Sequence, residues 1–319
     1  MNISIYGIFL HSILQPSAYF QIAKSSTTFS LQCSTFSHFV SPVIRINNIN
    51  SARSLSVFNS IFKFSKALEM ESHSGSKCKS SKILNLDHQS HSSTCIDFID
   101  CKFLNCSSLE YGGAVEVSSC NISFNYCIFR DCSSKFGGSI YSTHSKKMIV
   151  NQTSIVGSRA ERFGAIYSDS RRFEFSTNIS FTNISKSIGT IYIAGIRVET
   201  TRPNFQFVKF VSTYSKNFGA IWDWSTKPTT SIYFSCEFSN VTSDTPGAAI
   251  TLYHWLQQAH IENCIFHGSK GPDPIYIYFF SSESDVLIQK CKFDLPENSS
   301  IGQRYDGNNI TSVNNTFAL

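Results

Sequence analysis

The side chains best suited to holding a ligand are the aromatic residues around Asp223. Trp222 and Trp224 flank this carboxyl, and Tyr253 and Trp255 occupy the corresponding place one repeat later. Aromatic rings on an exposed turn stack on sugar rings, whereas the same rings also close over a wide turn of the chain. Both interpretations are open from the sequence. In the first, the four rings face outward together and form a ridge that contacts the ligand.

Cleavage of a polysaccharide needs carboxyl groups clustered on one face. In the register expected from the sequence, the stacked positions hold Glu116, Tyr141, Tyr167 and Tyr192 in one row, and Asp169 and Ala194 in another. We therefore expect no ladder of carboxylates. Nucleophile-turn and phosphate-loop motifs are absent as well. We expect a non-enzymatic protein without catalytic residues or cofactors. Asp223 and His254 are the two residues that a catalytic interpretation would test.

Nine of the eleven cysteines recur with the spacing of a repeat. They form the series Cys95 and Cys120, Cys101 and Cys127, Cys106 and Cys132, and Cys236, Cys264 and Cys291. Stacked coils bring such residues near the distance of a disulfide bond. A free cysteine in an inward strand position behaves as a small apolar residue, so both states stay open. No Cys-x-x-Cys spacing occurs, and we expect no metal site.

Asparagine is often followed by the pattern x-Ser/Thr. The ten such sites are Asn2, Asn105, Asn121, Asn151, Asn178, Asn183, Asn240, Asn298, Asn309 and Asn314. They are N-glycosylation acceptors if the chain enters a secretory route. The alternative is structural, because asparagine suits a corner and serine or threonine suits the strand that follows.

A repeat of about 26 residues positions all these side chains. Its clearest copies are Cys101–Ser108 with Gly112–Val115, and Cys127–Ser134 with Gly137–Ile140. An apolar anchor marks each copy: Phe36, Phe62, Phe103, Phe129, Ile155, Phe181, Phe210, Phe238, Phe266, Phe293 and Phe317. Such a period is typical of a solenoid.

Within each repeat, apolar residues alternate with polar ones, and Phe, Ile, Val, Tyr and Thr dominate, which favours strands. The period is too short for helical repeats. We therefore predict an all-β fold, a single-stranded right-handed parallel β-helix of about 11 coils. A corner with a left-handed backbone is expected two residues after each anchor, at Asn105, Asp131, Gly157, Asn183, Ser212, Asn240 and Gly268.

Residues 1–27 are expected to be either a signal peptide or a cap on the rod, and residues 28–319 the β-helix. The Ser-, His- and Lys-rich stretch at about 66–82 is expected to be a loop insertion. Smaller insertions are expected at 196–203 and 222–230. The final residues fall in the middle of a repeat, as expected of a fragment, a truncated product or a rod that assembles with something else.

The composition excludes some partners. Only 15% of residues are charged, the net charge is +5, and lysines and arginines are scattered, so we do not expect nucleic-acid binding. No stretch of 18 apolar residues occurs, so no transmembrane helix is expected. The 74 serines and threonines fit a polar exterior built from short side chains that favour strands.

The anchors resemble the polymorphic outer membrane protein repeats. Those repeats carry a Gly-Gly-Ala-Ile element, matched by Gly112–Val115 and Gly137–Ile140, and a Phe-x-x-Asn element. Phe103–Asn105, Phe181–Asn183 and Phe238–Asn240 match the second element with one residue fewer. In its low charge and its cysteine ladders, the chain looks more like the β-helix surface proteins of trichomonad protists.

This resemblance implies a cell-surface or extracellular adhesin that contacts a protein or glycan on a host or neighbouring cell. The competing function is binding or cleavage of a polysaccharide by a β-helix of the pectate-lyase type. A truncated structural remnant without activity is the third possibility.

Overall fold

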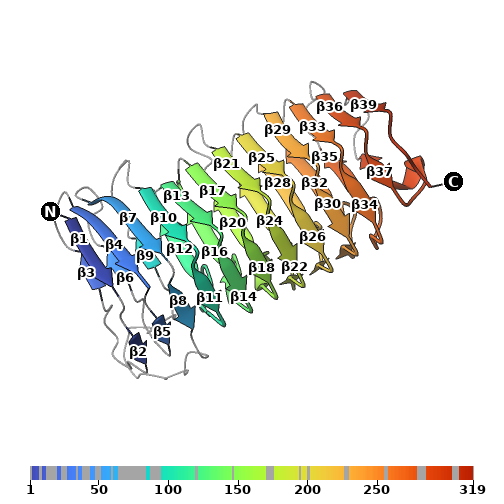
Figure 1. Cartoon of the computed structure of the whole chain (residues 1–319). Coiled ribbons are helices and arrows are strands. Elements are labelled where there is room, and N and C mark those ends of the chain that lie inside the picture. Colours follow the sequence, from blue (N-terminus) through green and yellow to red (C-terminus); the bar gives the residue numbers. More distant parts are fainter. Residues whose placement is uncertain are drawn as a thin grey trace.

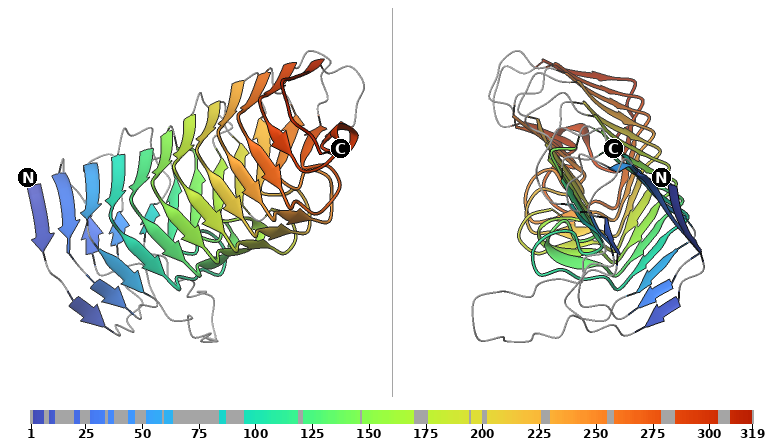
Figure 2. Two further views of the ribbon diagram at one scale, coloured as in Figure 1. Left: turned by 45° about the vertical axis from the view of Figure 1, so that its right-hand side comes forward. Right: turned by 90° about the vertical axis from the view of Figure 1, so that its left-hand side faces the viewer.

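The computed structural model describes residues 95–318 apart from short segments at 119–120, 146, 170–175, 194, 200–201, 226–229, 255–257, 279–284 and 304–308. Before residue 95 it describes strands β1 to β9 together with Cys33 and Ser60. The strands stack into an elongated rod whose two chain ends lie at opposite ends (Figure 1). Viewed from one end, the chain winds repeatedly around the long axis of this rod (Figure 2).

Three long parallel sheets form the walls of the rod. Sheet A contains β1 (Asn2–Tyr6), β4 (Thr27–Gln32), β7 (Ala52–Phe58), β10 (Cys95–Ile99), β13 (Asn121–Asn125), β17 (Lys147–Asn151), β21 (Ser176–Ser180), β25 (Arg202–Gln206), β29 (Thr230–Phe234), β33 (Gln258–Glu262), β36 (Asp285–Gln289) and β39 (Asn309–Val313). Sheet B contains β2 (Phe9–His11), β5 (Thr35–Ser37), β8 (Ile61–Lys63), β11 (Lys102–Leu104), β14 (Ile128–Arg130), β18 (Ser154–Val156), β22 (Asn183–Ser185), β26 (Lys209–Val211), β30 (Glu237–Ser239), β34 (Ile265–His267) and β37 (Lys292–Phe293).

Sheet C contains β3 (Phe20–Ile22), β6 (Ile44–Ile46), β9 (Leu84–Leu86), β12 (Val115–Ser118), β16 (Ile140–Thr143), β20 (Ile166–Asp169), β24 (Ile196–Glu199), β28 (Ile221–Ser225), β32 (Ile250–His254), β35 (Ile275–Tyr278) and β38 (Ile301–Gln303). A shorter sheet D lies between B and C in the chain and contains β15 (Ser133–Phe136), β19 (Arg159–Phe163), β23 (Ile188–Gly189), β27 (Tyr214–Ser215) and β31 (Thr242–Ser243). A 3-10 helix, η2 (Glu297–Ser299), follows β37.

The predicted fold class is confirmed. Each strand pairs in parallel with the strand one coil away, as β10 does with β13 and β11 with β14. Sheets B and C contain eleven strands each and sheet A contains twelve, in agreement with about 11 coils. Neighbouring strands in a sheet are about 4.8 Å apart, so residues one period apart lie directly above one another.

Alternate residues of each strand point into the rod and stack on their equivalents. In sheet A, Phe98 lies on Phe124 with ring centres 5.2 Å apart, and in sheet B Phe103 lies on Phe129 at 4.5 Å. All four rings are fully buried. Ring stacking between coils adds about 0.5–1.5 kcal/mol per pair to the gain from burial. The apolar alternation in the sequence therefore produces a continuous core along the rod.

The anchor ladder follows the sequence prediction with one correction. Phe62, Phe103, Phe129 and Ile155 stack in order, but Ile184, and not Phe181, pairs with Ile155. Ile184 in turn pairs with Phe210, and Leu10 extends the ladder before Phe36. The long step of 29 residues therefore runs from Ile155 to Ile184. The insertion expected at 196–203 is wrong, because the extra residues lie between β20 and β21.

The predicted corner after sheet B is confirmed at six of its seven positions. Asn105, Asp131, Gly157, Ser212, Asn240 and Gly268 have φ angles between 52° and 68°. The prediction is wrong for Asn183, which lies inside β22 because the anchor of its coil is Ile184. Lys186 takes the corner there, with a φ angle of 53°. This correction moves one corner by three residues and leaves the others in place.

A second left-handed corner precedes sheet B and is not apparent from the sequence. It is occupied by Asp100, Tyr126, Gln152, Phe181, Phe207, Ser235, Asn263 and Lys290, with φ angles from 47° to 58°. Asp and Asn tolerate this conformation, whereas aromatic residues rarely adopt it. Sequence analysis did not single out the row because its residue types are mixed.

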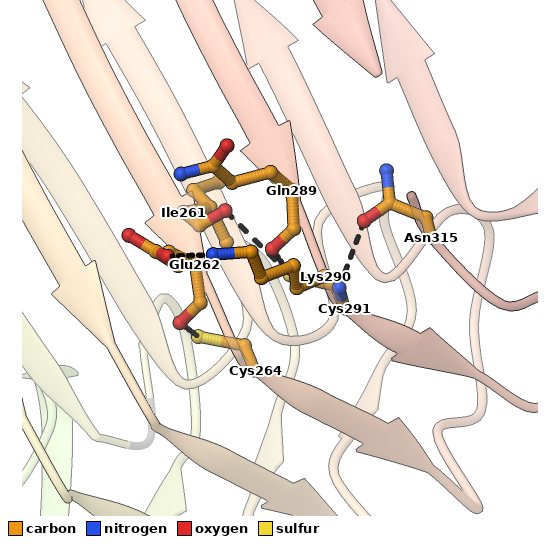
Figure 3. Close-up of polar contacts among 7 residues, drawn as sticks. All are labelled: Ile261, Glu262, Cys264, Gln289, Lys290, Cys291 and Asn315. Carbon is orange, nitrogen blue, oxygen red and sulfur yellow. Dashed lines mark hydrogen bonds and ion pairs between the residues drawn. The ribbon is translucent and has the colours of Figure 1, made fainter. Parts of the chain in front are cut away.

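The residue after this second corner is often a buried cysteine. Figure 3 shows two examples, in which Cys264 donates to the carbonyl oxygen of Glu262 at 3.4 Å and Cys291 to that of Gln289 at 3.3 Å. Lys290 lies outside them and pairs with the Glu262 carboxylate at 3.0 Å. The nine described cysteines form no disulfide bonds with one another. The ladder thus packs sulfur against backbone oxygens, consistent with a small apolar residue that donates weakly.

The two segments singled out near the N-terminus have different outcomes. Within residues 1–27, strands β1, β2 and β3 pair in parallel with β4, β5 and β6, so they form one more coil. The loop insertion expected at 66–82 lies outside the described residues.

Gly219 is expected to tolerate no side chain. A Cβ atom at this position would lie 2.0 Å from the carbonyl oxygen of Ala248 and 2.1 Å from that of Gly247 in the next coil. We predict that Gly219→Ala lowers the free energy of unfolding by about 1–3 kcal/mol, because the clash is with backbone atoms. Denaturant unfolding at 25 °C measures it. As a matched control, Ala248→Gly at the equivalent place should cost only about 0.5–1 kcal/mol, and equal costs would contradict the clash.

Candidate functional site

The outer face of sheet C carries a continuous row of aromatic and charged side chains. Strand alternation points one set inward and the other outward. In β16, β20, β24 and β28 the first outward position is held by Tyr141, Tyr167, Arg197 and Trp222, which stack in register. We call the outward residues Tyr141, Tyr167, Asp169, Arg197, Glu199, Trp222, Trp224 and Tyr253 the aromatic face.

Arg197 takes the place of a ring in this row. Its guanidinium carbon lies 4.1 Å from the ring centre of Phe163 and 4.1 Å from that of Trp222. The planar guanidinium is attracted to both rings and fills the gap between them. Only 8% of Arg197 is exposed, so its charge needs a partner. Glu199, on the same strand and the same face, forms an ion pair with it.

The next outward row brings two carboxyl groups together. Asp169 of β20 pairs directly with Glu199 of β24. The hydroxyl group of Tyr167 lies 3.2 Å from Asp169 Oδ2 and 3.2 Å from Glu199 Oε1, and its proton is shared between them. Both acids are buried, with 8% and 1% of their surface exposed. Tyrosine, arginine and the two acids therefore form one polar cluster under the rings.

Burial raises the pKa of Tyr167, and the nearby charges of Glu199 and Asp169 raise this pKa further. Deprotonation would add a third negative charge in a place with little water. The hydroxyl group therefore stays protonated near neutral pH and acts as a hydrogen-bond donor. It separates two carboxylates that would otherwise repel each other.

Half-buried rings surround this polar cluster. Trp224 and Tyr253 lie in paired strands with ring centres 4.5 Å apart, and Trp222 lies 4.9 Å from Trp224. On the other side, Phe218 stacks on Trp222 at 4.3 Å. Further rings extend the band along the rod: Tyr111, Phe136, Tyr141, Phe163 and Tyr192. The band crosses successive coils and suits an elongated ligand better than a small one.

The structure places three of the four aromatic residues that the sequence singled out. Trp222 is 4% exposed and is covered by neighbouring rings, so its role is to support the face. Trp224 and Tyr253 are half-buried and point outward side by side. Trp255 lies outside the described residues. Trp224 and Tyr253 therefore lie together as the ridge requires, while their contact with a ligand stays a prediction. Sequence analysis missed Tyr167, Arg197 and Glu199 as parts of the same face.

The prediction that no carboxyl groups stack in neighbouring coils is wrong. The sequence register placed Tyr192 above Tyr167 and Ala194 above Asp169, whereas the residues in those places are Arg197 and Glu199. The error arises because the strand of sheet C in this coil begins later in the sequence than the expected register assumes. Gly189 ends β23 in sheet D, and Ile196 begins the strand of sheet C. The sequence does contain a signal for the correct register, because Ile166, Ile196 and Ile221 begin three successive strands of sheet C and pair with one another.

Asp223 does not belong to the aromatic face. It points into the rod between Val198 and Leu252 and is fully buried. Ser231 and Tyr233 donate hydrogen bonds to its Oδ2 atom at 2.6 and 2.7 Å. The Asp223 carboxyl group is therefore held by hydrogen bonds in the core, where its role is structural. For His254 the structure describes only the backbone, as the end of β32.

The asparagines of the Asn-x-Ser/Thr sites differ in accessibility. Asn105, Asn183, Asn240, Asn298, Asn309 and Asn314 are exposed, and Asn121, Asn151 and Asn178 are half-buried. The side chain of Asn2 lies outside the described residues. Exposure at six sites is compatible with modification, and it equally fits asparagine at corners, since Asn105 and Asn240 have left-handed φ angles.

In the part of the chain that the structure describes, no three His, Cys, Asp or Glu residues are arranged to hold a metal ion. Nor does any helix there have the length and apolar character to span a bilayer. Comparison with family models, curated proteins and solved structures finds no match to this chain. The resemblance to the polymorphic outer membrane protein repeats thus stays a prediction.

Proposed function

We propose that this chain is a non-enzymatic β-helix protein of the cell surface or extracellular space that binds an extended glycan along the aromatic face. The observation that carries the proposal is the outward pair Trp224 and Tyr253, which continues a band of rings over several coils. Sugar rings present C–H groups that pack on aromatic faces such as those of this pair.

The distance between successive coils along the aromatic face favours a polymeric ligand. Neighbouring coils are about 4.8 Å apart, close to the length of one sugar residue, so successive coils can contact successive sugars of one chain. The carboxyl groups of Asp169 and Glu199 outnumber the guanidinium of Arg197 on this face. This charge favours neutral sugars over uronic acids, which the carboxylates would repel. The expected partner is therefore a neutral glycan on a host or neighbouring cell.

We predict that the double variant Trp224→Ala/Tyr253→Ala loses at least tenfold in affinity for such a glycan, because two stacked rings leave the site. Retention of the full chain on immobilised neutral polysaccharides, and on glycan-bearing cells, measures the loss. Tyr126→Ala is the matched control, because Tyr126 is 57% exposed at a corner away from sheet C. Equal retention of the double variant and the unchanged chain would contradict the proposal.

Cleavage of the glycan is the competing function, and the adjacency of Asp169 and Glu199 favours it. Retaining glycosidases place two carboxyl groups about 5 Å apart, which is also the step between neighbouring strands. Against it, both groups are buried and already bonded to Tyr167 and Arg197. We expect no new reducing ends when the chain is incubated with soluble polysaccharides. Release that Asp169→Asn or Glu199→Gln abolishes would favour the enzyme.

A further inference from the structure

A stacked pair of phenylalanines lies exposed on the rod, away from the aromatic face. Phe181 is 56% exposed and Phe207 is 41% exposed, and their ring centres are 4.8 Å apart with nearly parallel planes. Both occupy the corner before sheet B with φ angles of 48° and 56°. The neighbouring coils impose this left-handed backbone along the whole row of corners, so the φ angles give no sign of a ligand. An exposed ring pair is unfavourable in water, and a group that covers these two rings would therefore stabilise the protein.

A glycosylation acceptor lies beside them. Asn183 follows Phe181 by two residues, begins β22 and has an exposed side chain in the site Asn183-Ile184-Ser185. The residue between them, Thr182, is buried. β22 pairs with β26, which begins two residues after Phe207. The acceptor amide and both rings therefore lie on the same outer surface of two neighbouring coils.

We propose that Asn183 carries an N-linked glycan whose first sugar packs on Phe181 and Phe207. The proposal rests on the secretory route in the proposed function, and it is independent of ligand binding at sheet C. The glycan comes from a lipid-linked diphosphate oligosaccharide. A bond forms between Nδ2 of Asn183 and C1 of the sugar, the bond from C1 to the diphosphate oxygen breaks, the amide loses one proton, and the lipid diphosphate leaves.

Two other sites have the same sequence spacing but a different geometry. Asn105 and Asn240 also follow a phenylalanine by two residues, yet Phe103 and Phe238 are fully buried in the core. A glycan on either asparagine has no exposed ring at this spacing. The stabilising contact is therefore specific to Asn183, and Asn240 provides a matched control within the same protein.

The test compares the full chain, directed through the secretory pathway of a eukaryotic cell, with the same chain made in bacteria without glycans. Mass spectrometry of glycopeptides measures occupancy at Asn183 and Asn240. In the glycosylated chain, Asn183→Gln should lower the melting temperature by about 2 °C. The same substitution should change it little when Phe181→Ala is present, or in the bacterial protein. Asn240→Gln should have the same effect with or without Phe181.

Two results would overturn the proposal. One is an unmodified Asn183 in the secreted chain, whatever the state of the other sites. The other is a modified Asn183 whose replacement has equal effects with and without Phe181. Glycan binding by the double variant at Trp224 and Tyr253 is measured separately. If the glycan-binding proposal fails, the measurements of occupancy and melting temperature at Asn183 still test the present proposal. An unmodified Asn183, in turn, leaves the binding measurement at Trp224 and Tyr253 unaffected.

Discussion

Replacing Phe210 with alanine should lower the free energy of unfolding by about 3–5 kcal/mol. The ring is fully buried in sheet B and lies parallel to that of Phe238, with centres 5.2 Å apart. Ile184 contacts it from the preceding coil. The substitution removes a large apolar group and leaves a cavity that stacked coils close only in part, because hydrogen bonds hold each coil in register. Denaturant unfolding of the bacterial protein measures this loss.

Phe207→Ala is the matched control, three residues earlier in the same coil. Phe207 is 41% exposed, so its loss should change stability by roughly 0.5 kcal/mol or less in the glycan-free protein. The pair of variants tests the assignment of inward and outward positions around one corner. Equal losses for Phe207→Ala and Phe210→Ala would mean that the chain does not pack in this register.

Arg197→Met should cost about 3–5 kcal/mol at neutral pH. Methionine preserves much of the side-chain volume between Phe163 and Trp222 but removes the charge that pairs with Glu199. Glu199 would then stay buried beside Asp169 without its counter-charge. Thermal or denaturant unfolding measures the cost, and the double variant Arg197→Met/Glu199→Gln should recover most of it because the remaining group is neutral.

The same variant should respond to pH in a defined direction. Without Arg197, Glu199 is left buried beside Asp169 with no counter-charge, and its neutral form is then the less costly one. Such a group stabilises the fold relative to neutral pH once it is protonated, so the deficit of Arg197→Met should shrink as pH falls toward about 4. A deficit that stays constant with pH, or that Glu199→Gln does not relieve, would show that Arg197 contributes through packing only.

The repeat made most of the fold predictable. Recurrence of one apolar anchor about every 26 residues requires stacked coils, and the alternation before each anchor requires strands. The corner after sheet B was also predictable, because Asn105, Asp131 and Gly157 all favour a left-handed backbone. These features depend on residue type at a fixed place, which a sequence records directly.

The predicted register is wrong in the coil that contains Phe181. This residue continues the series of phenylalanines in the sequence, but it is an exposed corner residue, and the inward anchor is Ile184. An insertion between β20 and β21 shifts every later position of that coil, and periodicity alone does not say on which side of the anchor it falls. The juxtaposition of Asp169 with Glu199 was missed for the same reason.

The second corner and the inward carboxyl were beyond sequence reasoning for a different reason. Tyr126, Gln152 and Lys290 adopt left-handed angles because neighbouring coils impose them, and their residue types give no sign of it. Asp223 looked like part of an exposed turn between two tryptophans. Strand alternation instead sends it inward to Ser231 and Tyr233, while Trp222 and Trp224 point outward.

Tryptophan fluorescence tests the central proposal, glycan binding at the aromatic face, most directly. The chain has three tryptophans, of which Trp222 and Trp224 lie on this face. Titration with soluble neutral oligosaccharides should give a saturable change in emission, and uronic-acid oligosaccharides a weaker one. Tyr253→Ala keeps all three tryptophans and should shift the titration to higher oligosaccharide concentrations. A glycan that binds without altering emission, or a Tyr253→Ala variant that titrates like the unchanged chain, would contradict the proposal.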